Sequence, residues 1–250
     1  MRPHVIDFRE FYDSRLGAIS RRQIRLALKR LWPDTTGDAI FGLGYATPYL
    51  GPFRDGADRV FAIMPAAQGG VPWPREGRRC VSVADEADLP LGDNSIDRVV
   101  LVHAVEHSEV LHDMLAEVWR VLRPEGRLIV IAPNRHGLWA RAEKTPFGQG
   151  RPFSGSQLSR LLRDVGFAPQ ASRVALFMPP SRSRLVLRAA AIWLSVARVG
   201  IRPFGGVVLI ETSKQVVEAR PARRRGRRRV FAPVREGAVA ARAARDASAP

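Results

Sequence analysis

Residues 7–32 alternate apolar and charged positions at mostly three- and four-residue steps, which is the period of an α-helix. We expect Gly17 to divide this stretch into two helices, because glycine is a weak helix former. Pro33 and Gly37 end the pattern. The apolar positions are Phe8, Phe11, Tyr12, Leu16, Ile24, Leu28, Leu31 and Trp32.

Past Gly37 the pattern changes to short apolar runs, which are typical of strands buried on both faces of a sheet. Ser108 is predicted to cap a helix with one apolar stripe, between the fourth and fifth runs. Strands that alternate with helices in this way predict right-handed crossovers and an α/β fold with a doubly wound, mostly parallel sheet. The predicted strands are 38–43, 59–64, 80–84, 97–103 and 127–134.

The remaining elements are a helix at 156–165, a strand at 170–178, a helix at 184–199 and a last strand at 205–214. The helix at 184–199 is apolar nearly all round, apart from a narrow stripe of Arg184, Arg188, Ala191, Ser195 and Arg198. Such a helix either lies at an apolar interface or is buried, and the pattern does not choose between the two.

The positive charge is concentrated near the C-terminus. The chain carries +16, and residues 219–250 hold ten arginines against Glu236 and Asp246, a net charge of +8. This segment has few large apolar residues, so we expect a disordered tail that attracts nucleic acid or anionic lipid, or only keeps the protein soluble. The predicted division is an N-terminal helical segment at 1–37, an α/β domain at 38–218 and the tail at 219–250.

The cysteine content and the hydropathy pattern indicate the cytoplasm. Cys80 is the one cysteine, and the first residues lack the basic and then apolar pattern of a leader. The longest uncharged apolar run, 189–197, is far below the roughly 18 residues that a membrane span needs. We therefore expect a cytoplasmic protein that could still lie at a membrane surface through the helix at 184–199 or the tail.

Gly42 and Gly44 follow the first predicted strand, where glycines let backbone amides approach a ligand. A dinucleotide site would need a third glycine, where Thr47 stands, and an acid after the second strand, where "AIMPAAQ" has none. A nicotinamide-dependent enzyme is therefore a poor fit.

The segments "VADEADLPLGDNSIDRVVLVHAVEH" and "EVWRVLRPEGRLIVIAPN" are more specific. They resemble the class I S-adenosylmethionine-dependent methyltransferases, in particular the small-molecule group typified by ubiquinone and related C- and O-methyltransferases. The resemblance covers about residues 38–174 and rests on Asp85 with Leu89 and Pro90, the "NSID" turn, and "RVLRPEGRL". It implies a Rossmann-like, seven-stranded methyltransferase fold, with S-adenosyl-L-methionine as the cofactor.

The same resemblance implies roles for individual residues. Gly42, Gly44, Tyr45 and Ala46 would form the loop against the methionine part of the cofactor. Asp85 and Glu86 would lie at the adenine, and His103 with Ala104 would border the sulfonium. Met64 stands where the family binds the ribose. As a base for the acceptor's proton, His103 and His107 are the candidates, with His136 as a further one.

Two carboxylates that are usual in this family are missing. Ile40 replaces the acid of the first strand, and Met64 or Pro65 replaces the ribose-binding acid after the second. A hydrogen bond to a charged group contributes roughly 1.5–3 kcal/mol, so affinity falls tenfold or more unless Gln68 or backbone groups substitute. A catalytically inactive, methyltransferase-like binding module is therefore a second hypothesis.

"HAVEH", His103 to His107, also matches the HxxEH pattern of inverted zinc proteases. That chemistry needs both histidines one turn apart on the same helix, together with a third ligand and a water activated by Glu106. His103 ends a predicted strand, which disfavours the zinc hydrolase hypothesis, and the resemblance assigns no metal.

The acceptor would have to pass the N-terminal helices, the loop at 135–153 and the helix at 184–199, which surround the strand ends in similar proteins. These segments are apolar and aromatic, which favours a small apolar or lipid-like acceptor such as a quinone. A nucleic-acid acceptor is the competing hypothesis, and only the arginine-rich tail supports it. Phe231 is the one aromatic residue of that tail, so base stacking is not indicated.

Overall fold

The computed structural model describes residues 3–188 and 204–215, which belong to one compact unit, Met1–Val216. Val217–Pro250 form a second unit, of which no residue is described. The predicted tail and most of the predicted helix at 184–199 therefore lie outside the described residues.

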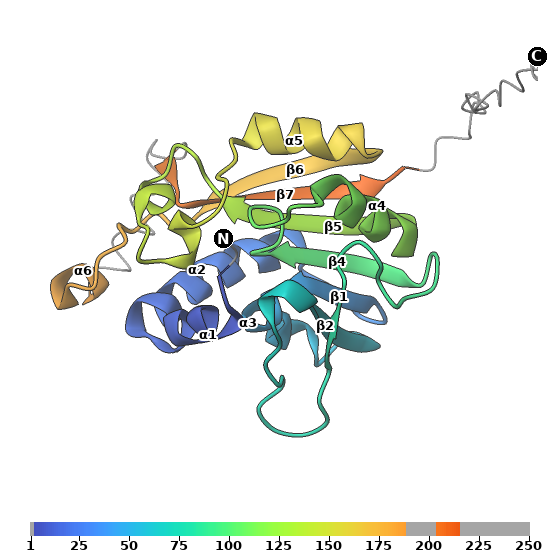
Figure 1. Cartoon of the computed structure of the whole chain (residues 1–250), viewed down its shortest axis with the longest axis horizontal. Coiled ribbons are helices and arrows are strands. Elements are labelled where there is room, and N and C mark those ends of the chain that lie inside the picture. The colour runs from blue at the N-terminus through green and yellow to red at the C-terminus, as the bar shows by residue number, and fades with distance from the viewer. Residues whose placement is uncertain (1–2, 189–203, 216–250) are drawn as a thin grey trace, which may run out of the picture. The chain divides into compact units, whose positions relative to one another are not determined.

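The sheet confirms the predicted fold class. Seven strands lie in the order β3-β2-β1-β4-β5-β7-β6, and β7 is antiparallel to both of its neighbours (Figure 1). The other pairs, from β3 to β5, are parallel. The strands are β1 (Ala39–Gly44), β2 (Arg59–Pro65), β3 (Val81–Ala84), β4 (Ile96–Val102), β5 (Leu122–Pro133), β6 (Phe167–Ala175) and β7 (Val207–Lys214).

Helices cover both faces of the sheet. The helices are α1 (Val5–Asp13), α2 (Arg15–Leu31), α3 (Thr47–Leu50), α4 (Leu111–Val121), α5 (Gly155–Asp164) and α6 (Arg184–Arg188). Alternate residues of β4 point to opposite faces, so Val100 packs with α1 and α2 while Leu101 packs with α4 and α5. Short 3-10 turns complete the connections, namely η1 (Gly51–Phe53), η2 (Ala66–Gln68), η3 (Leu138–Arg141) and η4 (Pro146–Gly148).

The break between the first two helices is at Ser14, so the prediction of a break at Gly17 was wrong. The Ser14 hydroxyl accepts a hydrogen bond from the Gly17 amide at 3.1 Å and so caps the start of α2. Gly17 instead lets the two helices approach closely, because a Cβ there would lie 2.0 Å from the Phe11 carbonyl oxygen.

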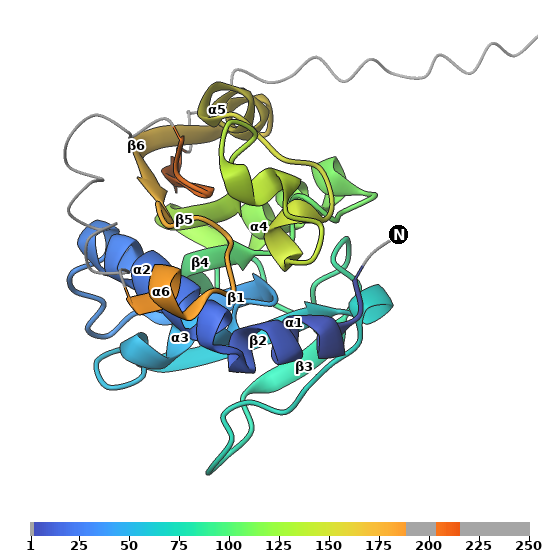
Figure 2. The same cartoon turned by 90° about the vertical axis from the view of Figure 1, so that its left-hand side faces the viewer.

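The parallel strands end at one edge of the sheet, and three segments gather there. In Figure 1 they are α1, the loop that follows β5, and α6, at the left-hand end of the strands. Figure 2 looks toward this edge and shows α1 lying across it, with α6 in front of α2. Among the described residues, every helix is too short or too polar to cross a membrane.

Candidate functional site

The glycine turn after β1 closes tightly against the end of β4. Gly44 has a φ of +83°, and a Cβ there would lie 2.3 Å from the Val102 carbonyl oxygen. The Tyr45 amide donates to that same oxygen at 2.9 Å. Gly42 serves the packing of α3, because its Cβ would lie 2.7 Å from Ala46 and from Leu50. Glycine is thus required at both positions for close approach of the chain.

His103 follows β4 and is held in a buried hydrogen-bonded chain. It has a φ of +51°, which is rare for a residue with a side chain and so signals a strained, over-determined position. Its Nδ1 lies 3.0 Å from Glu106 Oε1, and its Nε2 lies 2.8 Å from the Tyr12 hydroxyl. The Tyr12 hydroxyl lies 2.8 Å from that of Tyr49.

The carboxylate fixes the tautomer of this histidine. Because a carboxylate only accepts, Nδ1 of His103 donates to Glu106, and Nε2 is left to accept from the Tyr12 hydroxyl. The side chains of His103 and Glu106 are each only 1% exposed. The arrangement orients Nε2 of His103 as a proton acceptor that faces α1.

Aromatic rings of α1 cover the turn and the histidine. The Phe8 ring stacks on Tyr45 with 5.2 Å between centroids and lies 4.8 Å from the His103 ring. Burial raises the pKa of Tyr45 to about 12, and it also raises the pKa of Tyr12 and of Tyr49. These hydroxyls therefore stay protonated at neutral pH and can donate hydrogen bonds.

The loop after β3 meets the loop after β4. Asp85 is exposed and accepts from the Ala87 amide at 2.9 Å, whereas Glu86 is buried and accepts from the Ser108 hydroxyl at 2.7 Å. The predicted cap at Ser108 was wrong, because this hydroxyl binds Glu86 and α4 begins at Leu111. The adenine role of Asp85 and Glu86 stays a prediction.

Met64 at the end of β2 and Gln68 just after it fit the ribose end of the implied cofactor. Met64 is buried, and its sulfur accepts from the Val71 amide at 3.4 Å. Gln68 is 1% exposed, and neither its amide oxygen nor its amide nitrogen has a hydrogen-bond partner among the described residues. A buried amide in this state leaves its donating nitrogen and its accepting oxygen open, which matches a sugar diol.

The structure brings Gly44, Tyr45 and His103 together, and His107 lies nearby with its ring centroid 6.4 Å from that of His103. His136 is exposed in the loop after β5. Tyr12 and Glu106 were not among the predicted cofactor or base residues. The helical stripe that includes Tyr12 marked it as buried, but its partner could not be known from the sequence.

The HxxEH residues do not have the geometry of a zinc hydrolase. One ligand atom each from His103, Glu106 and His107 lies within 4.8 Å of the others. However, residues 103–107 form bends and turns instead of a helix, and both ring nitrogens of His103 are hydrogen bonded. The requirement of one shared helix is not met, and we do not propose a metal site there.

A large cavity lies on the other side of α1. Its volume is about 1140 Å³, and it is bounded by α1, the loop at 141–149 and residues 180–187. Phe8 and Phe11 form part of its apolar lining. Because Phe8 also contacts His103, one aromatic ring separates the cavity from the histidine.

The strand order and the glycine turn beside the end of β4 are those of the class I methyltransferase fold. Residues 41–130 match the family model described as a methyltransferase domain. This segment, about a third of the chain, is therefore similar to S-adenosylmethionine-dependent methyltransferases, and the whole described unit has their class I fold.

Curated proteins are similar in sequence to part of this chain. A protein of Mycolicibacterium smegmatis named as a probable S-adenosylmethionine-dependent methyltransferase is 36% identical over 83 residues, which are 32% of this chain and 32% of the relative. The chain thus spans about a third of the length of the first curated relatives it matches. Demethylmenaquinone methyltransferase of Thermus thermophilus is 26% identical over 176 residues, 68% of this chain and 79% of that protein.

Solved structures support the fold. An S-adenosylmethionine-dependent methyltransferase of Thermotoga maritima has a TM-score of 0.59 at 20% identity and covers 84% of this chain and 96% of its own. One from Archaeoglobus fulgidus has a TM-score of 0.53 at 17% identity, with 84% and 98% covered.

Proposed function

We propose that this protein transfers a methyl group from S-adenosylmethionine to a small apolar or lipid-like acceptor. The observation that carries the proposal is the buried cluster in which the glycine turn after β1 meets His103 after β4, in a chain with the class I methyltransferase fold. The cavity beside this cluster would receive the acceptor.

The cofactor, when bound, supplies a methyl group activated by a sulfonium sulfur, which keeps the electron pair of the broken bond as the acceptor attacks the methyl carbon. In the proposal, Gln68 binds the ribose hydroxyls, Glu86 lies near the adenine, and the turn at Gly44 and Tyr45 holds the methionine part. Phe8 lies between Tyr45 and His103, so α1 has to shift for the cofactor to enter.

His103 acts as the base in the proposed reaction. Glu106 holds it in the tautomer with Nε2 free to accept a proton, the orienting role that a carboxylate has in a catalytic triad. An acceptor hydroxyl that takes the place of the Tyr12 hydroxyl would donate to the same nitrogen. His107 lies beside this pair and is kept as a second candidate.

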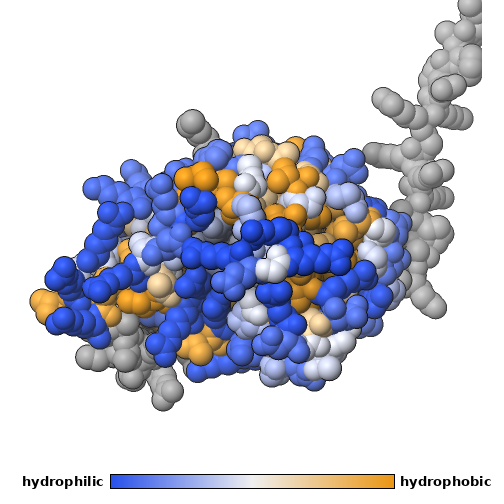
Figure 3. Space-filling view, turned by 90° about the horizontal axis from the view of Figure 1, so that it is seen from below, coloured by the Kyte–Doolittle hydropathy of each residue, from blue (hydrophilic) through white to orange (hydrophobic). Residues whose placement is uncertain are grey.

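The lining of the site favours an apolar acceptor. Phe8 and Phe11 form the wall of the cavity next to His103. The relative from Thermus thermophilus is named for demethylmenaquinone, which is a quinone. Leu185 on α6 is 77% exposed and Phe204 is 60% exposed, and Figure 3 shows apolar side chains among hydrophilic ones at the left-hand end. Attachment to a membrane surface would suit this end, while a nucleic-acid acceptor rests only on the tail.

The proposed reaction is tested with tritiated S-adenosylmethionine and a hydroquinone probe, 1,4-naphthohydroquinone. We expect label to pass into the organic phase, and His103→Gln to lower the initial rate roughly a hundredfold, as removal of a general base does. His136→Gln is the matched control, because this histidine is exposed, and it should keep the rate. Equal rates in both variants would contradict the role of His103.

A binding module without catalysis is the second candidate, and the position of Phe8 favours it. If α1 never shifts, the cofactor has no place between Tyr45 and His103. Protein that binds neither S-adenosylmethionine nor S-adenosylhomocysteine would support this candidate instead.

A further inference from the structure

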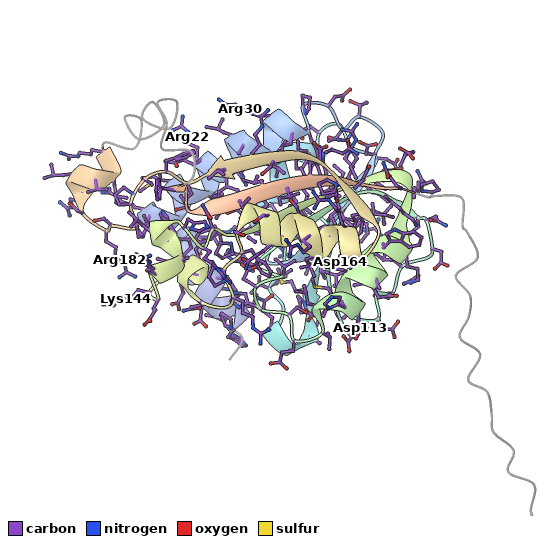
Figure 4. The ribbon with its side chains drawn as sticks, turned by 90° about the horizontal axis from the view of Figure 1, so that it is seen from above. Arg22, Arg30, Asp113, Lys144, Asp164 and Arg182 are labelled. Carbon is purple, nitrogen blue, oxygen red and sulfur yellow. The ribbon has the colours of Figure 1, made fainter. Side chains whose placement is uncertain are left out.

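The walls of the cavity beside α1 differ in charge. The loop at 141–144 and the segment at 182–184 contribute Arg141, Lys144, Arg182 and Arg184, against the single acid Glu143. The opposite wall contributes Asp7 and Glu10 from α1 and Arg15 from the start of α2. Figure 4 shows the labelled Lys144 and Arg182 at the same end of the molecule, and both line the cavity.

The cations of the first wall are not neutralised within the described part of the chain. Elsewhere in that part, Arg75, Arg98, Arg120, Arg123 and Arg127 each have a carboxylate partner. None of Arg141, Lys144, Arg182 and Arg184 forms an ion pair with a described residue, although Glu143 lies in the same loop. Four cations at the rim of one cavity, with no carboxylate partner among residues 3–188 and 204–215, attract an anionic group.

The floor of the same cavity is apolar. Phe8, Phe11 and Leu16 line it from the N-terminal helices, and Pro146 and Leu187 line it from the other side. Phe11 packs edge-on against the buried Phe147 and Trp139, at 5.9 and 6.4 Å between centroids, so this floor is backed by further rings. A volume of about 1140 Å³ exceeds the roughly 300–1,000 Å³ of most small-molecule sites, which leaves room for an extended ligand.

We infer that the acceptor is an anionic amphiphile. Its apolar body lies on the half-buried Phe11 and Leu187, next to the buried Phe8 ring that contacts His103, and its anionic group lies against Arg141, Lys144 and Arg182. This inference rests on the proposed function and narrows it, since an uncharged quinone would use the floor of the cavity but not its basic rim.

The test compares three probes by calorimetry with the full chain and without cofactor. The probes are n-octyl phosphate, the uncharged n-octyl glucoside and inorganic phosphate, each below any micelle concentration. We expect n-octyl phosphate to bind most tightly, because it alone uses both the floor and the rim. Its affinity should fall as the salt concentration rises from about 0.01 to about 1 M, where the Debye length shrinks from roughly 30 to 3 Å.

Charge variants locate the anionic group. Lys144→Gln with Arg182→Gln should lower the affinity for n-octyl phosphate roughly fivefold, which is the size expected for two solvent-exposed ion pairs. The affinity for n-octyl glucoside should not change. The matched control is Arg22→Gln with Arg30→Gln, which removes the same charge from exposed positions of α2 outside the cavity lining (Figure 4). All four side chains are exposed, so the substitutions should not impair folding.

Two results would overturn the inference. Equal affinity for n-octyl phosphate and n-octyl glucoside would mean that the basic rim does not distinguish an anionic ligand from an uncharged one. An equal loss of affinity in the Arg22→Gln and Arg30→Gln control would mean that n-octyl phosphate binding depends only on the net charge of the protein. A separate titration with S-adenosylhomocysteine keeps the two proposals apart. Cofactor binding without amphiphile binding removes this inference alone, whereas amphiphile binding without cofactor binding removes the methyl transfer and leaves an amphiphile site that holds no methyl acceptor.

Discussion

At the scale of single residues, Gln68 and Gln23 share one feature with different expected consequences. Both are buried, and both have an amide group with no hydrogen-bond partner among the described residues. Gln68 follows β2 at the edge where the parallel strands end, whereas Gln23 lies within α2. An unpaired buried amide costs about 1–3 kcal/mol, so each side chain either destabilises the protein or awaits a ligand.

Gln68→Leu should therefore raise the free energy of unfolding by about 1 kcal/mol. It should also lower the affinity for S-adenosylhomocysteine roughly tenfold, because the ribose loses hydrogen bonds to the amide nitrogen and oxygen. Chemical denaturation and calorimetry measure the two effects. Gln23→Leu is the control and should give the same gain in stability with no change in affinity. Unchanged affinity in Gln68→Leu would remove this residue from the proposed cofactor site.

At the scale of elements, α1 decides whether the site is open. The ring of Phe8 lies between Tyr45 and His103, and the Tyr12 hydroxyl is bonded to His103 Nε2. A protein whose binding-competent state is only partly populated binds its ligand more weakly by that fraction. In the proposed function, α1 is therefore a cover that competes with the cofactor.

Phe8→Ala should lower the free energy of unfolding by about 3–5 kcal/mol, as loss of a buried phenylalanine does, and raise the affinity for S-adenosylhomocysteine about tenfold. Phe53→Ala is the matched control, since Phe53 is also buried but packs on Trp32. It should lose stability without any gain in affinity. A weaker S-adenosylhomocysteine affinity in Phe8→Ala would show that the ring supports the cofactor instead of displacing it.

The elements themselves were largely predictable. The apolar run at 97–103 is long and uninterrupted, so a buried strand was the natural interpretation, and β4 spans Ile96–Val102. The wrong details concern polar side chains with alternative partners. Ser14 caps α2 through a local contact with the Gly17 amide. Ser108 instead donates to Glu86, 22 positions away, and no local pattern shows that tertiary contact.

The site was less predictable than the fold. The family resemblance named Gly44 and His103 as candidates, which stay predictions. The apolar stripe of α1 predicts that Phe8 and Tyr12 are buried but not which groups they contact. The chain from Glu106 through His103 to Tyr12 joins residues more than 90 positions apart. No local pattern carries such information.

At the scale of the whole molecule, the positive charge and the buried contacts belong to different proposed sites. Half of the net charge of +16 lies in residues 219–250, outside the described residues. The other half includes the basic rim of the cavity next to the cluster around His103. We thus expect cofactor binding to depend on buried contacts and acceptor binding to depend on the salt concentration.

If the strand ends under α1 form a cofactor site, a calorimetric titration with S-adenosylhomocysteine detects it. The titration uses the full chain and its Phe8→Ala variant. We expect saturable binding to one site at micromolar concentration, and tighter binding in Phe8→Ala. Absence of binding up to millimolar concentration in both proteins would contradict this expectation and leave a methyltransferase fold that serves another ligand.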